Sequence, residues 1–179
     1  MPKHLIKISL GVLVLVCGVS SCNGVVSTNQ PLPTERVPIS NSSQKPNPIQ
    51  FNNLEKSVHQ QINQYRQSQN LPSLSWDETI AQQARVHSQA MASGAAPFSH
   101  KGFEGRINSI SQSIAYRSVA ENLAYNQGYS NPDQQAVAGW LESPGHLKNI
   151  QGDFNLTGVG IAKNSKDEYY FTQIFLKRP

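Results

Sequence analysis

Three stretches of the chain repeat apolar residues at the spacing of an amphipathic helix. In chain order the repeating residues are Leu54, Val58, Ile62 and Tyr65; Ile80, Ala84, His87 and Met91; and Ala136, Val137, Trp140 and Leu141. The first helix is expected to end before Pro72 and the second near Gly94. Ser75-Trp76-Asp77-Glu78 predicts a capping box with Ser75 as N-cap of the second helix, and Ser143-Pro144 predicts the start of a further short helix.

The last third of the chain follows a period of two instead. Thr157, Val159 and Ile161 alternate with small residues, residues 169–176 alternate in the same way, and residues 164–167 have turn chemistry. This pattern predicts two antiparallel strands joined by a turn. Helices early in the chain and paired strands late in it indicate the α+β class, with helices covering a small antiparallel sheet.

The N-terminus has the three parts of a secretory signal peptide: two lysines near Met1, an apolar run from Ile8 to Val19, and small residues before Cys22. The run is shorter than the roughly 20 residues that span a bilayer. Val19-Ser20-Ser21-Cys22 resembles a bacterial lipobox, so residues 1–21 are expected to be removed and Cys22 to be lipidated. The alternative is an ordinary signal peptide with a chance cysteine, which would give a secreted protein.

Residues 22–50 carry five prolines and many Ser, Asn and Gln residues without aliphatic periodicity. Such a segment buries too little apolar surface to offset its ordering entropy, so a disordered tether is predicted. Residues 51–179 form the expected globular domain. With Cys17 in the peptide that is removed and Cys22 lipidated, no thiol pair remains for a disulfide in this domain.

Charge argues against a nucleic-acid partner. The whole chain has a net charge of +4. From Phe51 onward, however, 11 Lys and Arg face 10 Asp and Glu, a balance of +1. No basic stripe interleaved with aromatic residues is present in the sequence, so nucleic-acid binding is not expected.

Eight short blocks, in order over the whole predicted domain, resemble the CAP superfamily, which groups cysteine-rich secretory proteins, antigen 5 and pathogenesis-related proteins around the SCP domain. The blocks are Asn63-Gln64-Tyr65-Arg66, Leu74-Ser75-Trp76-Asp77, Ala84-Arg85-Val86-His87-Ser88, Phe98-Ser99-His100, Ala120-Glu121-Asn122-Leu123-Ala124, Gly139-Trp140-Leu141-Glu142-Ser143-Pro144-Gly145-His146, Gly158-Val159-Gly160 and Tyr170-Phe171-Thr172-Gln173-Ile174-Phe175. The Ser-Pro-Gly-His element is typical of the bacterial branch. The resemblance implies a three-layer α-β-α sandwich.

The resemblance also implies a cleft lined by two histidines and two glutamates. His100 matches the first histidine and Glu121 the first glutamate, whereas Ser143 stands at the place of the second glutamate and Tyr170 at that of the second histidine. In the bacterial branch His146 supplies an imidazole instead. His100, Glu121 and His146 are therefore the candidate cleft and ligand-binding residues.

Three functions are compatible with these residues. Two imidazoles and a carboxylate can hold a divalent metal such as zinc, which would support a metal-dependent hydrolase of peptide or peptidoglycan material. The same cleft could instead bind an envelope, lipid or protein ligand without catalysis, and the domain could also be a scaffold for protein partners. The incomplete tetrad favours a non-catalytic, exported binding protein that a lipid at Cys22 holds to a membrane.

Two further residues have competing interpretations. Arg106 could pair with a carboxylate in the cleft or form a surface ion pair. His87 lies on the apolar face of the second predicted helix, which favours a buried, hydrogen-bonded histidine of the core.

Overall fold

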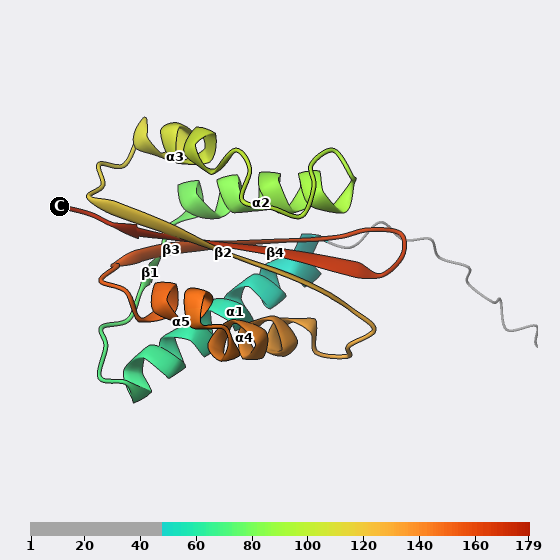
Figure 1. The fold of residues 1–179 in the computed structure, drawn as a ribbon, viewed down its shortest axis with the longest axis horizontal. Helices are drawn as coiled ribbons and strands as arrows, with labels where there is room; N and C mark the ends of the chain where they lie inside the picture. Colours follow the sequence, from blue (N-terminus) through green and yellow to red (C-terminus); the bar gives the residue numbers. More distant parts are fainter. Residues whose placement is uncertain (1–47) are drawn as a thin grey trace, which may run out of the picture. The chain divides into compact units, whose positions relative to one another are not determined.

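The computed structural model describes residues 48–179, which form three layers (Figure 1). A four-stranded sheet lies in the middle, with α2 and α3 on one face and α1, α4 and α5 on the other. The elements are α1 (Pro48–Ser68), β1 (Ser75–Trp76), α2 (Glu78–Ala92), α3 (Phe103–Ser111), β2 (Ser118–Gln127), α4 (Pro132–Glu142), α5 (Pro144–Gln151), β3 (Leu156–Lys163) and β4 (Glu168–Lys177). This arrangement confirms the predicted α+β class and the α-β-α sandwich.

The predicted signal peptide, the lipidation site Cys22 and most of the predicted tether lie outside the described residues. Helix α1 begins at Pro48, slightly before the predicted start of the domain at Phe51. Within residues 48–179 there is no helix with the length and apolar character needed to cross a membrane.

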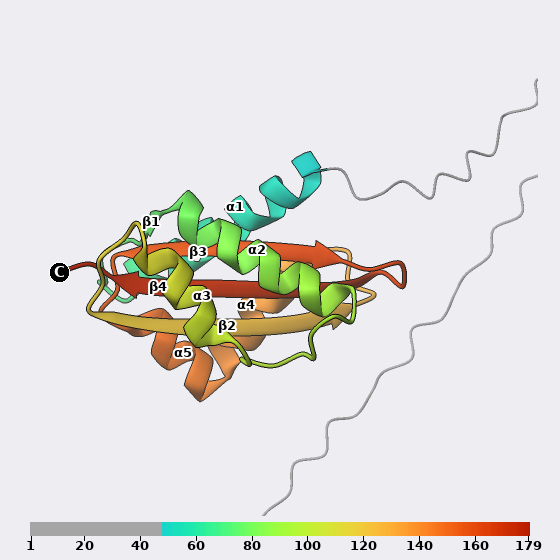
Figure 2. The ribbon, with the colours of Figure 1, turned by 90° about the horizontal axis from the view of Figure 1, so that it is seen from above.

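The sheet has the order β1-β3-β4-β2, so β2 is one of its two edge strands (Figure 2). Strands β3 and β4 form the predicted hairpin, and β4 also pairs antiparallel with β2. The prediction of an antiparallel sheet was wrong in one respect, because β1 pairs parallel to β3 through Ser75 and Trp76. The sheet is therefore mixed.

That pairing also corrects the predicted start of the second helix. Ser75 belongs to β1 and does not cap α2; the N-cap is Asp77, whose carboxylate accepts the Ile80 N–H at 3.1 Å. The backbone of Ser75 is held against β3, with its N–H donating to the Asn155 carbonyl. The helix therefore begins after the short strand. Ser143, by contrast, occupies the N-cap position of α5 as predicted, although its side chain makes no capping hydrogen bond.

Strand β2 and helix α3 were not predicted. In β2 the residues Glu121, Asn122 and Asn126 are buried, with relative exposures of 6%, 0% and 6%. Buried polar residues break the alternation of apolar and polar positions that marks a strand in a sequence. Their partners lie on α3, α4 and α5, which a local pattern cannot include.

Helix α2 packs directly on the backbone of β3. A Cβ atom added at Gly158 would lie 2.6 Å from the carbonyl carbon of Ile80, and one at Gly160 would lie 2.5 Å from the Cα of Arg85. The Ser88 hydroxyl of α2 donates to the Gly160 carbonyl at 2.9 Å. The Gly158-Val159-Gly160 block thus gives α2 the space to approach the sheet. This close packing fixes the position of α2 on its face of the sheet, and α3 lies beside α2 on the same face (Figure 1).

Candidate functional site

Two of the three predicted site residues meet at a buried carboxylate. Glu121 lies on β2 with its side chain only 2% exposed, and both of its oxygens accept hydrogen bonds. The Arg106 Nε–H and Nη2–H donate to them at 2.9 and 2.8 Å, a bidentate pair. The His100 Nδ1–H donates to Glu121 Oε1 at 2.9 Å, while the imidazole remains 56% exposed. Of the two interpretations of Arg106, pairing with a carboxylate of the site is confirmed.

The elements around β2 explain why these groups converge. Glu121 is opposite Ile174 in the register with β4, and its side chain points to the face covered by α2 and α3. Arg106 comes from the first turns of α3, and its Nη1–H also donates to the Lys101 carbonyl at 3.1 Å. A buried carboxylate needs such compensation, because desolvation of an unpaired charge costs several kcal/mol. The cluster of Glu121, Arg106 and His100 is therefore a satisfied unit.

The third predicted residue, His146, lies in the first turn of α5. Burial lowers the pKa of its imidazole below the ordinary value of 6.5, and the nearby charge of His100 lowers it further. Asn122 holds the backbone here, since its Nδ2–H donates to the His146 carbonyl at 3.2 Å and its Oδ1 accepts from Asn149 at 2.9 Å. His146 thus presents a neutral imidazole at neutral pH, within electrostatic reach of His100.

These residues do not fit the predicted metal site. Among residues 48–179 no group of three or more His, Cys, Asp or Glu side chains is arranged to hold a metal ion. The chemistry of the cluster gives the reason: both oxygens of Glu121 are already engaged, and the Arg106 guanidinium places a fixed positive charge where a cation would have to lie. The arrangement favours a neutral or anionic ligand.

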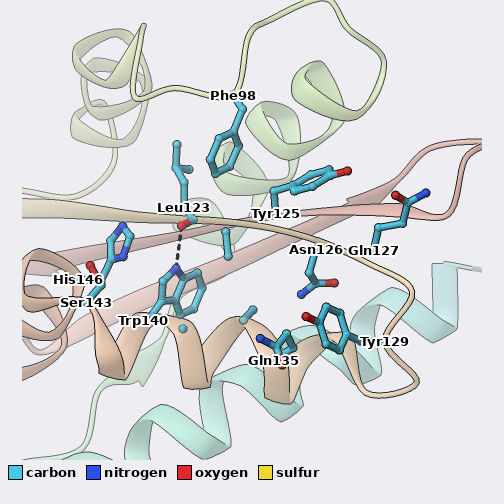
Figure 3. A pocket seen from close by; sticks show the side chains of 13 residues that line it. Phe98, Leu123, Tyr125, Asn126, Gln127, Tyr129, Gln135, Trp140, Ser143 and His146 are labelled. Carbon is cyan, nitrogen blue, oxygen red and sulfur yellow. Dashed lines mark hydrogen bonds between the residues drawn. The ribbon is translucent and has the colours of Figure 1, made fainter.

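His146 instead lines one end of a groove of about 600 Å³ (Figure 3). One wall is β2 from Leu123 to Gln127, and the other is α4, with Ser143 next to His146. Phe98, from the segment that follows α2, lies on the opposite side of β2 from α4, so the groove extends around the edge of the sheet. We call this site the edge groove. Its lining residues are Phe98, Leu123, Ala124, Tyr125, Asn126, Gln127, Tyr129, Gln135, Ala136, Gly139, Trp140, Ser143 and His146.

The edge groove is aromatic and uncharged. It contains no Asp, Glu, Lys or Arg side chain. Three of its aromatic residues, Phe98, Tyr125 and Tyr129, are 51%, 44% and 52% exposed. A cluster of exposed aromatic side chains of this kind often marks a binding site. The sequence placed His146 and the Ser143 position in the cleft, but it did not assign the β2 residues of the groove to a site, because β2 itself was not predicted.

Gly139 leaves the floor of the edge groove open. It lies in the interior of α4, and nothing lies within 4 Å of the position that a Cβ would take there. A glycine inside a helix costs roughly 0.5–1 kcal/mol relative to alanine. No packing constraint explains this one, and an absent side chain allows a ligand to approach the helix backbone.

Three residues near the site lie in different environments. His87 is buried as predicted: it is 5% exposed, its Nε2–H donates to the Ser99 carbonyl at 3.0 Å, and burial lowers its pKa. Glu142, one position before Ser143, is exposed and does not line the edge groove. Ser143, at the place where the resemblance expects a second glutamate, does line it.

The three-layer sandwich with a histidine–glutamate cluster beside a groove at the sheet edge defines a CAP-type domain. The chain matches the family described as CAP, the cysteine-rich secretory protein family, over residues 59–175, and it belongs to that family.

Curated relatives occur in Bacillus subtilis. The chain is 34% identical over 128 residues to the uncharacterized membrane protein YlbC, and 32% identical over 133 residues to the uncharacterized protein YkwD. These matches cover 69% and 72% of this chain but only 34% and 49% of the relatives. The chain therefore spans between about a third and a half of the proteins it matches.

Solved structures share the fold. An extracellular protein containing an SCP domain from Bacillus anthracis is 27% identical, with a TM-score of 0.61 over 76% of this chain and 45% of that chain. An outer surface protein from Borrelia burgdorferi has the same TM-score at 23% identity, over 71% of this chain and 94% of that chain. The second likeness concerns the fold alone.

Proposed function

We propose that this chain is an exported CAP-domain protein of the cell envelope, that a lipid at Cys22 holds it to a membrane, and that it binds a ligand in the edge groove beside His146. The lipobox-like Val19-Ser20-Ser21-Cys22 supports the anchor. The names of two relatives support the location, since YlbC is called a membrane protein and the Bacillus anthracis protein extracellular.

Two features together support the binding function: the Glu121 carboxylate is already hydrogen-bonded within the protein, and the edge groove is open and has no charged side chain. A general base must reach the proton of a bound water with a free lone pair. Both oxygens of Glu121 accept hydrogen bonds from Arg106 and His100, and its side chain is only 2% exposed, so Glu121 stabilises the site more readily than it activates water. The imidazole of His146 has no carboxylate partner among residues 48–179. This arrangement supports binding without turnover.

Partly filling the edge groove is expected to weaken ligand binding without weakening the fold. Gly139→Phe places a ring on the groove floor, where open space accepts it, and phenylalanine suits a helix better than glycine. The probe is the envelope fraction of the source cells, sedimented with the full-length chain carrying Cys22→Ala so that no lipid contributes. Gly139→Phe should weaken the association about tenfold, a loss of roughly 1.4 kcal/mol.

Gly139→Ala in the same background is the matched control, because its methyl group leaves most of the groove open. It should sediment like the parent chain. Equal sedimentation of all three proteins would contradict binding in the edge groove and favour a scaffold that uses another surface.

The anchor is tested separately by metabolic labelling with radioactive palmitate. The wild-type chain should incorporate label and fractionate with membranes, whereas Cys22→Ala should lose the label and appear in the soluble fraction. Cys17→Ala is the control, since Cys17 precedes the expected cleavage point and should not affect labelling of the mature protein. Label in neither the wild type nor Cys22→Ala would show that Cys22 carries no lipid.

A further inference from the structure

Strand β2 exposes its backbone along the edge groove. In an antiparallel pair, alternate residues of a strand turn their N–H and C=O groups away from the partner strand. The Glu121 and Leu123 carbonyls accept side-chain hydrogen bonds from Asn149 at 3.3 Å and from Trp140 at 2.8 Å, so these odd-numbered residues face outward. By the same alternation, Tyr125 and Gln127 also direct their backbone groups away from β4 and toward the groove.

Two outward carbonyls in the middle of β2 are covered, whereas the outward groups at its C-terminal end are open. Asn149 and Trp140 cover the outward carbonyls of Glu121 and Leu123 (Figure 3 shows the bond from Trp140). For the outward N–H and C=O groups of Tyr125 and Gln127, no hydrogen-bond partner exists among residues 48–179. The two residues therefore offer donor–acceptor pairs about 6.6 Å apart, the repeat of an extended peptide.

The opposite edge of the sheet, on β3, is partly covered. Strand β1 pairs with the start of β3, and further along the Glu55 carboxylate from α1 accepts the Ile161 N–H at 3.3 Å. Proteins commonly cover exposed edges in this way, because unpaired strands invite further pairing. Here a cover exists at the start of β3, at the Ile161 N–H and at the Glu121 and Leu123 carbonyls of β2, but not at Tyr125 and Gln127.

A second observation at the same place points to a missing hydrogen-bond donor. Asn126 is 6% exposed; its Nδ2–H donates to the Pro132 carbonyl at 2.8 Å, but its Oδ1 has no partner. Figure 3 shows this amide between β2 and Tyr129 in the lining of the edge groove. Buried acceptors without a partner are rare and costly, so a ligand that brings a donor here would be favoured.

We propose that the ligand of the edge groove is an extended, uncharged peptide segment that adds to the sheet as a fifth strand beside Tyr125 and Gln127. This inference rests on the proposed function and names its ligand class. Alternate side chains of the peptide would contact Phe98 and Tyr125 on one side of the sheet and the open floor at Gly139 on the other. The absence of formal charge from the lining favours a neutral segment. Main-chain hydrogen bonds supply affinity in such strand addition, and the pockets supply selectivity.

The probe is a library of acetylated, amidated hexapeptides composed of Val, Thr, Tyr, Ala, Ser and Gln, screened against the full-length chain carrying Cys22→Ala. Tyr125→Pro removes the outward N–H, which makes no bond to β4, and edge strands accept proline at such positions. Tyr125→Ala removes the side chain but keeps the N–H. For the best peptide, Tyr125→Pro should weaken binding at least tenfold more than Tyr125→Ala does.

N-methylation of the peptide tests the same bonds without altering the protein. Methyl groups on every second nitrogen should abolish binding, and methyl groups on the intervening nitrogens should be tolerated, because alternate N–H groups face β2. Bound peptide should also slow hydrogen exchange of the Tyr125 and Gln127 amides. Failure of every peptide to bind, equal losses for both Tyr125 variants, or insensitivity to the position of N-methylation would each overturn strand addition.

The envelope assay with the Gly139 variants separates this inference from the proposed function. If Gly139→Phe abolishes envelope binding while Tyr125→Pro leaves it intact, the edge groove binds a ligand but not by strand addition. Saturable binding of a chitin oligosaccharide that protects neither amide would likewise overturn strand addition and assign the groove to a glycan. If Gly139→Phe has no effect, the groove itself is not the site.

Discussion

Gly160→Ala is expected to unfold the domain or to lower its free energy of unfolding by about 3 kcal/mol or more. The added Cβ would lie closer than 3.0 Å to backbone atoms of Ala84 and Arg85, a separation that real Cβ atoms essentially never show. Backbone atoms in the middle of α2 cannot rotate away as a side chain could. The helix would have to move off β3, which would also break the hydrogen bond from Ser88 to the Gly160 carbonyl.

Urea denaturation followed by circular dichroism measures this loss, and Gly139→Ala provides a control of identical chemistry. At Gly139 the new methyl group meets open space inside α4, so that variant should gain about 0.5–1 kcal/mol from helix propensity. Gly158→Ala should behave like Gly160→Ala, because its Cβ would approach the backbone of Ile80 and Ala81. An unfolding midpoint for Gly160→Ala equal to that of the wild type would disprove the close contact between α2 and β3.

Arg106→Met should cost about 3–5 kcal/mol, because it removes the guanidinium that pairs with the buried Glu121 carboxylate and leaves the hydrogen bond from His100. Methionine retains much of the volume of the arginine stem, so the loss reports the missing guanidinium more than a cavity.

A double variant separates charge from packing. Arg106→Met combined with Glu121→Leu replaces the whole ion pair by apolar groups, which is often neutral in a buried site, so most of the stability should return. Lys163→Met, which removes the largely exposed pair with Asp167, should have a much smaller effect. A double variant no more stable than Arg106→Met alone would mean that the uncompensated charge was not the cause of the loss.

The local sequence pattern was sufficient to predict the helices and strands whose buried side chains are apolar. Val58 and Ile62 in α1 and Ile80 and Ala84 in α2 are fully buried, as their helical spacing predicted. The β3–β4 hairpin followed from its period of two. The sequence blocks also identified His100 and Glu121, which do meet, although 21 positions separate them.

The chain alone could not reveal β2, α3 or the edge groove. Glu121 is buried only because Arg106, 15 positions away, neutralises it, and Asn122 only because Asn149 and the His146 backbone bond to it. The spacing of apolar residues along the chain predicts which side chains are buried because they are hydrophobic. A polar side chain is buried only when another residue, often distant in the sequence, forms a hydrogen bond or ion pair with it. The sequence by itself therefore determined the apolar layers and the family. Only the tertiary structure decided which strand lies at the edge, which of its backbone groups stay unpaired, and that Arg106 bonds both oxygens of Glu121.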